Sequence, residues 1–434
     1  MTAAGRHGPT LSLDDLNRAL LARQHLLAPR PASYPAAAGA PARTSTTPAA
    51  PVAAVSSTPA AAGPATTPAP RSTPTLAEVD HLVGLQSQVP TTPYPGLWSR
   101  LEGFRTDHLA NRFDDRSVTR IAVMRGTVHL VTADDALELP GVLRPLLESG
   151  VRVGSVHAKA LVGTDLGDVA AAAQDLLAEA PLTSTDLGRL LGERWPDVHP
   201  QHLAYTARCY LPLVQVTPRG VWGASGPGTT TTWTTADAWF GRPSRSLRDP
   251  DERFEALVRL VRRYLAAFGP ATVMDAQRWS GLTGLRDVVG HLRPELTTFT
   301  GPDGKELLDL PGAPRPGADA PAPLALVAEF DNLVLGHADR TRVVDDVRRK
   351  AITTVNGQVP GTVLVDGYVA ATWKVRRSGS RPATSPGAVA HLDVTPLGHT
   401  FTPAQRTALE ERGGELLRFV APEATEHVVA VGAG

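Results

Sequence analysis

Two glutamines, Gln86 and Gln88, flank Ser87 at the end of a predicted amphipathic helix. Within a regular helix their side chains would point about 200° apart around the axis. If the helix ends there, both amides can converge on one spot in the following turn. A glutamine amide is neutral and carries both a donor and an acceptor. Such a pair could position a water molecule and stabilise a developing cation, although polar residues at this place also serve as ordinary helix caps.

A second polar group lies between the apolar residues of segment 330–340 and contains Asp331, Asn332, His337 and Arg340. A histidine here could act as an acid or base, contact a phosphate or form a buried hydrogen bond. Asp and Asn also cap the backbone of structural turns. Both interpretations stay open from the residues alone.

Arg125 and Gly126 occupy the predicted tip of a hairpin, with His129 shortly after them. An arginine at a hairpin tip is a natural phosphate contact. An exposed turn without function is the alternative.

The segment from Arg340 to Arg381 carries nine cations and three acids. A charge run is commonly a solvated face, but next to DNA-binding modules it could contact the phosphate backbone. Besides Arg340, the candidate contacts in this run are Arg342, Lys374, Arg376 and Arg377.

The composition excludes several classes of protein. The chain has 434 residues, with 43 Lys and Arg against 43 Asp and Glu, which argues against a polybasic protein that coats nucleic acid. A single cysteine, Cys209, permits neither an internal disulfide nor a thiolate zinc cluster. No nucleotide-binding or dinucleotide-binding fingerprint is present. We therefore expect no metal and no cofactor.

The termini and hydropathy predict a soluble cytoplasmic protein. The N-terminal residues are polar and lack the apolar core of a secretory signal. No run of about 18 apolar residues suggests a transmembrane helix.

Three similar groups of elements must position the candidate residues. Each has three helices followed by a strand pair, the outline of a winged helix, and the groups recur about 80 to 100 residues apart. The predicted elements are helices at 13–27, 75–88 and 97–105 with a hairpin at 117–132, helices at 165–178, 183–192 and 201–208 with a hairpin at 211–222, and helices at 251–268, 272–279 and 282–292 with a hairpin at 296–310.

An Ala-, Pro- and Thr-rich segment from 29 to 75 interrupts the first group and is predicted to be disordered, because it contains almost no large apolar residues. We therefore predict a first domain at 10–28 and 76–150, a second at 151–245, a third at 246–322 and a mostly β C-terminal domain at 323–434 that includes a helix at 402–415.

Four stretches, in this order, resemble the winged-helix DNA glycosylases of the AlkZ/YcaQ type: GLQSQVPTTPYPGLWSRL, MRGTVHLV, EFDNLVLGHADR and VNGQVPGTVLVDGYVAATWKV. The resemblance spans residues 13 to about 429 apart from the insertion. It implies an α+β fold with three tandem winged-helix domains and a C-terminal β-barrel-like domain, which together form a C-shaped channel for duplex DNA.

The same resemblance implies monofunctional removal of cationic N-alkylated purines and, in some members, unhooking of interstrand crosslinks. The family's catalytic Gln-x-Gln pair maps onto Gln86 and Gln88, with Ser87 where an aliphatic residue is usual. A cationic purine is already a good leaving group, so a positioned water and stabilisation of an oxocarbenium-like sugar are the main needs. The lesion need not swing fully into a pocket.

We expect the protein to act as a monomer in the nucleoid, with duplex DNA as its partner and no membrane. The alternative is a non-catalytic winged-helix transcriptional regulator, in which the same basic surfaces read operator DNA. A plain regulator needs neither the glutamine pair nor the C-terminal domain. The sequence does not identify the lesion.

Overall fold

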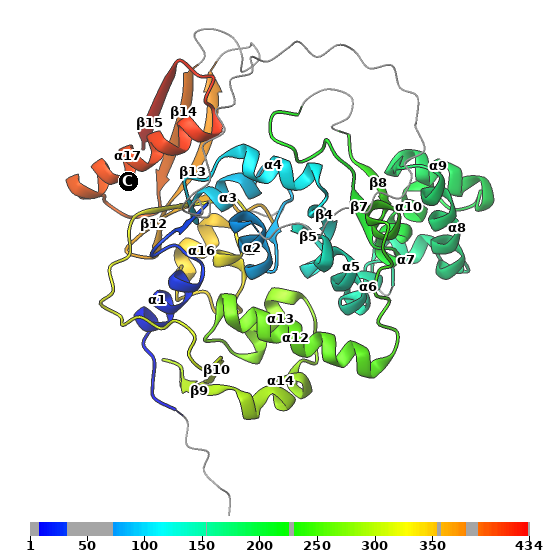
Figure 1. Cartoon of the computed structure of the whole chain (residues 1–434), viewed down its shortest axis with the longest axis horizontal. Coiled ribbons are helices and arrows are strands. Elements are labelled where there is room, and N and C mark those ends of the chain that lie inside the picture. Colours follow the sequence, from blue (N-terminus) through cyan, green and yellow to red (C-terminus); the bar gives the residue numbers. More distant parts are fainter. Residues whose placement is uncertain are drawn as a thin grey trace, which may run out of the picture.

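The computed structural model describes residues 8–32, 73–152, 154–224, 230–353, 357–378 and 389–432. The C-terminal sheet and helices α8 to α10 lie on opposite sides of the molecule, with helices α2 to α4 and the β4–β5 hairpin between them (Figure 1). Among the described residues, no helix combines the length and the apolarity needed to cross a membrane.

The glutamine pair lies on a strand and not at a helix end. Helix α2 (Pro74–His81) is shorter than predicted, because Val83 and Gly84 take left-handed conformations with φ of 53° and 89°. The chain then enters strand β2 (Leu85–Gln86). A left-handed β-branched residue such as Val83 is a backbone outlier, which needs support from its surroundings.

The rest of the first unit matches the prediction in part. Helix α1 (Leu13–Arg23) starts at a capping box of Ser12 and Asp15. The hairpin predicted at 117–132 is confirmed, whereas the helix predicted at 97–105 is wrong, since the end of an earlier helix and a short strand occupy that stretch. The observed elements are α3 (Pro93–Trp98), β3 (Leu101–Glu102), α4 (Thr106–Asp114), β4 (Val118–Ala122), the 3-10 turn η1 (Met124–Gly126) and β5 (Val128–Thr132).

The second unit shares its sheet with the first. The predicted hairpin at 211–222 is wrong, because β7 (Leu213–Gln215) pairs with β4 on one side and with β8 (Thr232–Thr235) on the other. One six-stranded sheet of order β2-β5-β4-β7-β8-β6 results. The three predicted helices of this unit are present as α8 (Leu166–Glu179), α9 (Ser184–Arg194) and α10 (Pro200–Tyr210). The unpredicted elements around them are α5 (Ala133–Val142), α6 (Arg144–Ser149), α7 (Val156–Ala160), β6 (Leu182–Thr183) and α11 (Ala236–Phe240).

The third unit agrees closely with its prediction. Its long first helix, α12 (Pro250–Phe268), begins at Asp249, whose side chain accepts from the first backbone amides. The other elements are α13 (Val273–Ser280), α14 (Arg286–Leu292), η3 (Arg293–Glu295), β9 (Thr297–Thr300) and β10 (Glu306–Asp309).

The C-terminal region is mostly β, as predicted, but its described strands form an open sheet and not a closed barrel. The sheet order is β11-β12-β13-β14-β15, with the last pair parallel. Helix α17 (Pro403–Val420) packs on it and begins at Thr402 as predicted. The remaining bounds are β11 (Ala325–Val327), α15 (Asn332–Leu335), α16 (Asp346–Ile352), β12 (Gly361–Val365), β13 (Tyr368–Ser378), β14 (Val389–Pro396) and β15 (Glu426–Val431).

Both ends of the Ala- and Pro-rich insertion are ordered, which corrects its predicted limits. Strand β1 (Arg30–Pro31) pairs in parallel with β3, and Ala32 is buried. At the other end, Thr73 caps α2. The predicted disorder between them concerns residues 33–72, which lie outside the described part of the chain.

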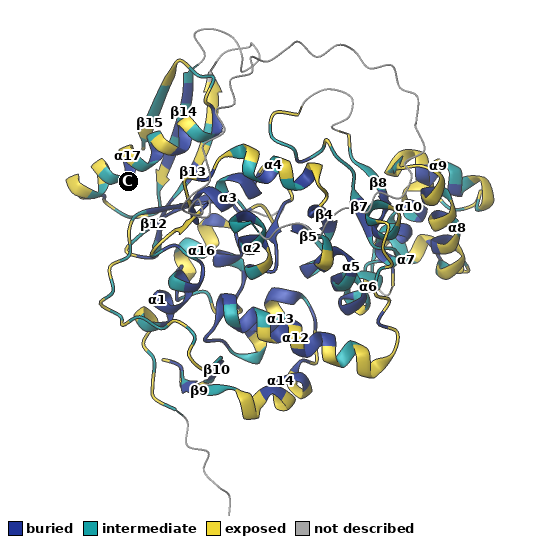
Figure 2. Ribbon diagram, in the orientation of Figure 1, coloured by how far each residue is buried: buried dark blue, intermediate teal, exposed yellow. Residues whose placement is uncertain are grey.

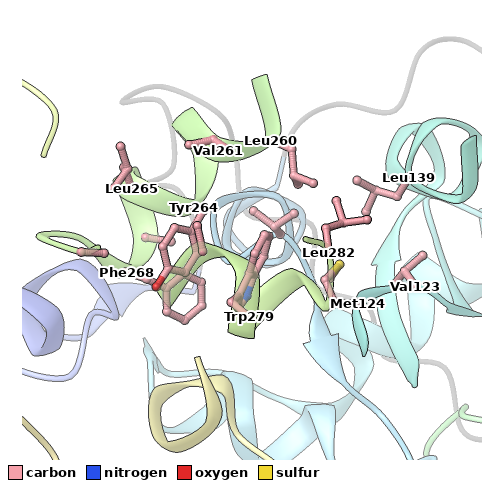
Figure 3. Packing of buried hydrophobic residues seen from close by; sticks show 14 of the residues in the cluster. Val123, Met124, Leu139, Leu260, Val261, Tyr264, Leu265, Phe268, Trp279 and Leu282 are labelled. Atoms are coloured by element: carbon pink, nitrogen blue, oxygen red, sulfur yellow. The ribbon is translucent and has the colours of Figure 1, made fainter. Parts of the chain in front are cut away.

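The largest hydrophobic cluster fixes the hairpin tip between β4 and β5. Met124 from this tip packs among residues of α12 and α13, including Tyr264 and Trp279, whose ring centroids are 5.0 Å apart (Figure 3). The interior of this region is buried, while α8, α9 and α14 turn exposed faces outward (Figure 2). Arg125 therefore follows a buried anchor.

Candidate active site

Strand β2 holds Gln86 in a fixed position. Gln86 pairs across the strands with His129 of β5 and is buried. Its Oε1 accepts a hydrogen bond of 2.7 Å from Nη2 of Arg125. Because a guanidinium can only donate, this contact fixes the orientation of the amide.

Gln88 lies just beyond β2 and is exposed. Its Oε1 accepts from the backbone N–H of Val128 at 3.2 Å, and this donor likewise fixes the amide. Within the described chain, no residue accepts from Nε2 of either glutamine. The site therefore presents two amide N–H donors, while both amide oxygens are occupied.

Ser87 faces the interior between the two glutamines. The buried Arg120 of β4 donates from Nε to the Ser87 hydroxyl at 2.9 Å and from Nη2 to the Ser87 carbonyl oxygen at 2.6 Å. The same guanidinium donates to Gln215 of β7. Ser87 thus accepts twice from a buried arginine, an interaction for which an aliphatic side chain has no hydroxyl, and this arginine joins the glutamine strand to the second unit.

Arg125 connects three parts of the fold. Besides Gln86, its guanidinium donates to Oδ1 of Asn332 at 2.8 Å and to the Trp279 carbonyl oxygen at 2.6 Å. Its backbone has a left-handed φ of 54°. Burial, with the nearby cations Arg278 and Arg340, lowers the pKa of Arg125 to about 10. The structure thus places Arg125 inward, at the glutamine pair, and not on an exposed turn.

Arg120 and Arg125 share an electrostatic feature. Neither forms an ion pair with a carboxylate in the described residues, and both donate to neutral oxygens. Burial, followed by the nearby Arg219, also lowers the pKa of Arg120 to about 9. Two positive charges therefore lie behind the glutamine strand.

Asp331 and Asn332 are adjacent but have different surroundings. Both Asp331 oxygens accept from the buried Arg100, at 2.8 and 2.9 Å, and Oδ1 also caps α15 through the Leu333 amide. Asp331 is therefore engaged in a buried ion pair. Asn332, in contrast, leaves its Nδ2 buried without a hydrogen-bond partner.

A small cavity of about 10 Å³ lies against these residues, which is about the room that one water molecule needs. Gln86, Asp331, Asn332 and Glu329 line it together with Phe268. Glu329 begins the EFDN stretch, but it was not predicted as a site residue, because nothing in its spacing shows that this side chain faces the cavity.

His129 and His337 are both buried, with 0% and 1% of their surface exposed, so neither reaches the surface to contact DNA. Nδ1 of His129 lies 3.0 Å from the Thr127 carbonyl oxygen, and Nε2 of His337 lies 3.0 Å from that of Phe268. Burial is the main cause that lowers both pKa values well below the usual range of histidine. Both imidazoles are neutral parts of the core.

Arg340 and Arg342 lie beyond α15 and differ in exposure. Arg342 is buried and donates to the Pro270 carbonyl oxygen at 2.7 Å, so it supports the core. Arg340 is partly exposed, and burial together with Arg278 and Arg349 lowers its pKa to about 10. The exposed Arg278 of α13, which the sequence analysis missed, joins Arg340 and Arg125 in one cationic group.

The remaining cations of the 340–381 run are largely paired. Arg376 forms an ion pair with Asp393, and Arg377 forms one with Glu423. Arg348 and Arg349 pair with Asp345 and Asp346 in the same way. Lys374 is exposed on β13. The run is therefore not one free cationic face, and Arg381 lies outside the described residues.

In the parts of the chain that the structure describes, no group of three or more His, Cys, Asp or Glu residues is arranged to hold a metal ion. The chemistry that the site offers consists of amide donors, fixed cations and the Glu329 carboxylate.

Comparison with known proteins gives consistent results. The family model described as DNA glycosylase AlkZ-like matches residues 79–419. The chain is 26% identical over 324 residues to a Streptomyces sahachiroi protein named interstrand DNA cross-link repair glycosylase, covering 70% of this chain and 84% of that protein. The solved structure of Streptomyces sahachiroi DNA glycosylase AlkZ superposes with a TM-score of 0.70 at 17% identity, over 98% of this chain and all of that one. The matched family region contains both glutamines and every other candidate residue, so the chain belongs to the AlkZ-like family of DNA glycosylases.

Proposed function

We propose that this DNA glycosylase hydrolyses the N-glycosidic bond of cationic N-alkylated purines with a water molecule that Gln86 and Gln88 position. The observation that carries the proposal is the fixed orientation of both amides. Arg125 and the Val128 amide occupy the two Oε1 atoms, which leaves the Nε2 groups to donate to a water or to the sugar. A water held through one lone pair keeps the other for attack on C1′.

The leaving group explains why the site needs no acid beside the neutral amides. A purine alkylated at N7 or N3 carries a positive charge before the bond breaks and leaves as a neutral base, so it requires no acid. The barrier then depends on orientation of the water and on stabilisation of the oxocarbenium-like sugar.

We further propose that the three groups of helices and strands act as winged-helix modules around a channel for duplex DNA. The exposed position of Gln88 supports an open site, in which a lesion is attacked without being enclosed. Such a site suits a bulky or crosslinked purine. The name of the Streptomyces sahachiroi relative supports interstrand crosslinks as a second class of substrate.

The test is incubation of the protein with duplex DNA that carries N7-methylguanine. Release of free base by the wild type, lost in Gln86→Ala and Gln88→Ala variants that still bind the duplex, supports the proposal. Binding without release at enzyme excess would instead identify a DNA-binding regulator.

A second measurement tests the monofunctional mechanism. With water as the nucleophile, the product is an intact strand with an abasic site, which breaks only after alkali. Borohydride should trap no covalent complex, although Lys374 lies near the cavity and contributes to the charge around Glu329. A trapped complex that disappears in Lys374→Met would overturn this part of the proposal.

A further inference from the structure

Glu329 is a carboxylate without a hydrogen-bond donor at the candidate active site. It lies between β11 and α15, lines the same cavity as Gln86 and Asn332, and is partly buried. Among the described residues, no side chain or backbone amide donates to its carboxylate. A carboxylate that is removed from bulk water is ordinarily compensated by such donors. The lack of donors at Glu329 therefore requires an explanation.

The reaction needs a proton acceptor that the other groups at this cavity do not supply. When water attacks C1′, one of its protons must leave. The amide oxygens of Gln86 and Gln88 already accept hydrogen bonds from the protein. Both oxygens of Asp331 are occupied by Arg100.

Arg125 and Gln24 do not supply the acceptor either. The guanidinium of Arg125 can only donate. Gln24, which also lines the cavity, accepts from Arg100 through Oε1 and donates to the Ala267 carbonyl oxygen through Nε2. Among the described side chains that line the cavity, Glu329 is therefore the carboxylate that is free to accept a proton.

We propose that Glu329 is the general base that accepts the proton of the attacking water, an inference that rests on the proposed function. The oxygen of the water forms the bond to C1′, and the C1′–N bond breaks with its electron pair passing to the purine. The cationic base leaves neutral, and the proton of the water moves to the Glu329 carboxylate, so atoms and charge balance. The acid later returns this proton to solvent.

The charges around Glu329 suit this role. Burial raises its pKa above the usual range of glutamic acid, and Lys374 from β13 opposes that effect. The other charged groups at the cavity are the Arg100–Asp331 ion pair and Arg125, which reaches it through Gln86 and Asn332. A raised pKa makes the carboxylate a better proton acceptor.

The backbone that carries these groups is strained in all three segments. Val83 before the glutamine pair, Arg125 and Phe330 directly after Glu329 have φ of 53°, 54° and 58°. Non-glycine residues in this region cost free energy and persist where the surrounding structure enforces them. That Phe330 is one of them indicates that the direction of the chain at Glu329 is enforced.

The decisive experiment measures single-turnover excision of N7-methylguanine by Glu329→Gln across a range of pH. The glutamine preserves size and hydrogen bonding but accepts no proton. We expect the rate of excision to fall about 100-fold, with duplex affinity unchanged. This loss is small for the removal of a general base, because the leaving group is already activated.

The wild-type rate should decline as the pH falls through the raised pKa of Glu329, and this acidic limb of the pH profile should disappear in the variant. Glu411→Gln, on the exposed face of α17, is the matched control.

Two further variants keep the inference testable. In Glu329→Ala, added formate should restore part of the rate. In Lys374→Gln, which keeps Glu329 in place, the acidic limb should move to higher pH because the opposing charge is gone. If Glu329→Gln excised the base at the wild-type rate while Gln86→Ala was inactive, the inference would be overturned and the proposed function would stand. An unshifted limb in Lys374→Gln would also count against it. If the wild type released no base, the proposed function itself would fail.

Discussion

Arg120 donates to both the hydroxyl and the carbonyl oxygen of Ser87, the residue between the two glutamines, and so anchors the chain from inside the protein. Ser87 has no surface exposure, so the guanidinium is held by neutral oxygens inside the protein. A buried cation with neutral partners depends on each of them, because loss of one leaves a donor unsatisfied. The middle residue of the glutamine motif is thus part of the support for its neighbours.

Ser87→Ala should lower both stability and activity. The change removes the acceptor for Nε of Arg120, and an unsatisfied buried donor costs about 1–3 kcal/mol of unfolding free energy. Excision should fall as well, since the strand between Gln86 and Gln88 loses its anchor. Urea denaturation and single-turnover excision measure the two effects. Ser246→Ala, at an exposed serine, is the control and should change stability by less than about 0.5 kcal/mol. A Ser87→Ala variant as stable as this control would contradict the assignment.

Arg125→Lys should impair excision more than it impairs folding. Arg125 donates at the same time to Gln86, Asn332 and the Trp279 carbonyl oxygen. The ammonium group of a lysine lacks the planar, branched guanidinium that reaches acceptors in different directions. With its oxygen freed, the Gln86 amide can rotate and present either end to the water. We expect a loss of about 10-fold or more in excision, in line with a misplaced catalytic group. Arg189→Lys on exposed α9 is the control. Unchanged excision in Arg125→Lys would show that the amide needs no fixed orientation.

Arg278 and Arg340 should contribute to DNA affinity more than Arg376 does. In the described chain, neither Arg278 nor Arg340 forms an ion pair with a carboxylate, whereas Asp393 neutralises Arg376. Each free arginine that contacts a phosphate should add about one unit to the slope of log K against log salt. Binding isotherms of Arg278→Gln, Arg340→Gln and Arg376→Gln over a salt series measure this. Equal slopes in all three variants would show that the free arginines do not face the DNA.

The sequence alone predicts the third unit well and the sheet poorly. Local signals such as Asp249 before α12 and Thr402 before α17 fix helix starts, and both are present. The pairing of β7 with β4 is a contact between distant segments, for which no local pattern exists. The helix predicted at 75–88 failed because the left-handed Val83 contradicts the propensity of a β-branched residue.

In the candidate site, too, the sequence predicts some features, and others depend on contacts between distant segments. Residue type and resemblance identify Gln86 and Gln88, and the structure shows what holds them. The direction in which Arg125 points and the free carboxylate of Glu329 depend on tertiary packing, since Arg125 itself and Phe330 next to Glu329 take left-handed conformations that propensity does not predict. Conversely, His129 and His337 have a suitable chemical type, but packing buries them.

Replacement of residues 33–72 by a short Gly/Ser linker should leave folding and excision largely unchanged. Both edges of this insertion are anchored by contacts of their own. Ala32 donates from its backbone to the Glu102 carbonyl oxygen at 2.8 Å, and Glu78 of α2 contacts His25 at 2.9 Å. A longer deletion of 31–74 would also remove part of β1 and the Thr73 cap, and should cost about 1 kcal/mol or more through the cap alone. Thermal melting of the two deletions distinguishes these cases. If the shorter deletion destabilised the protein as much as the longer one, the insertion itself would have to pack against the fold.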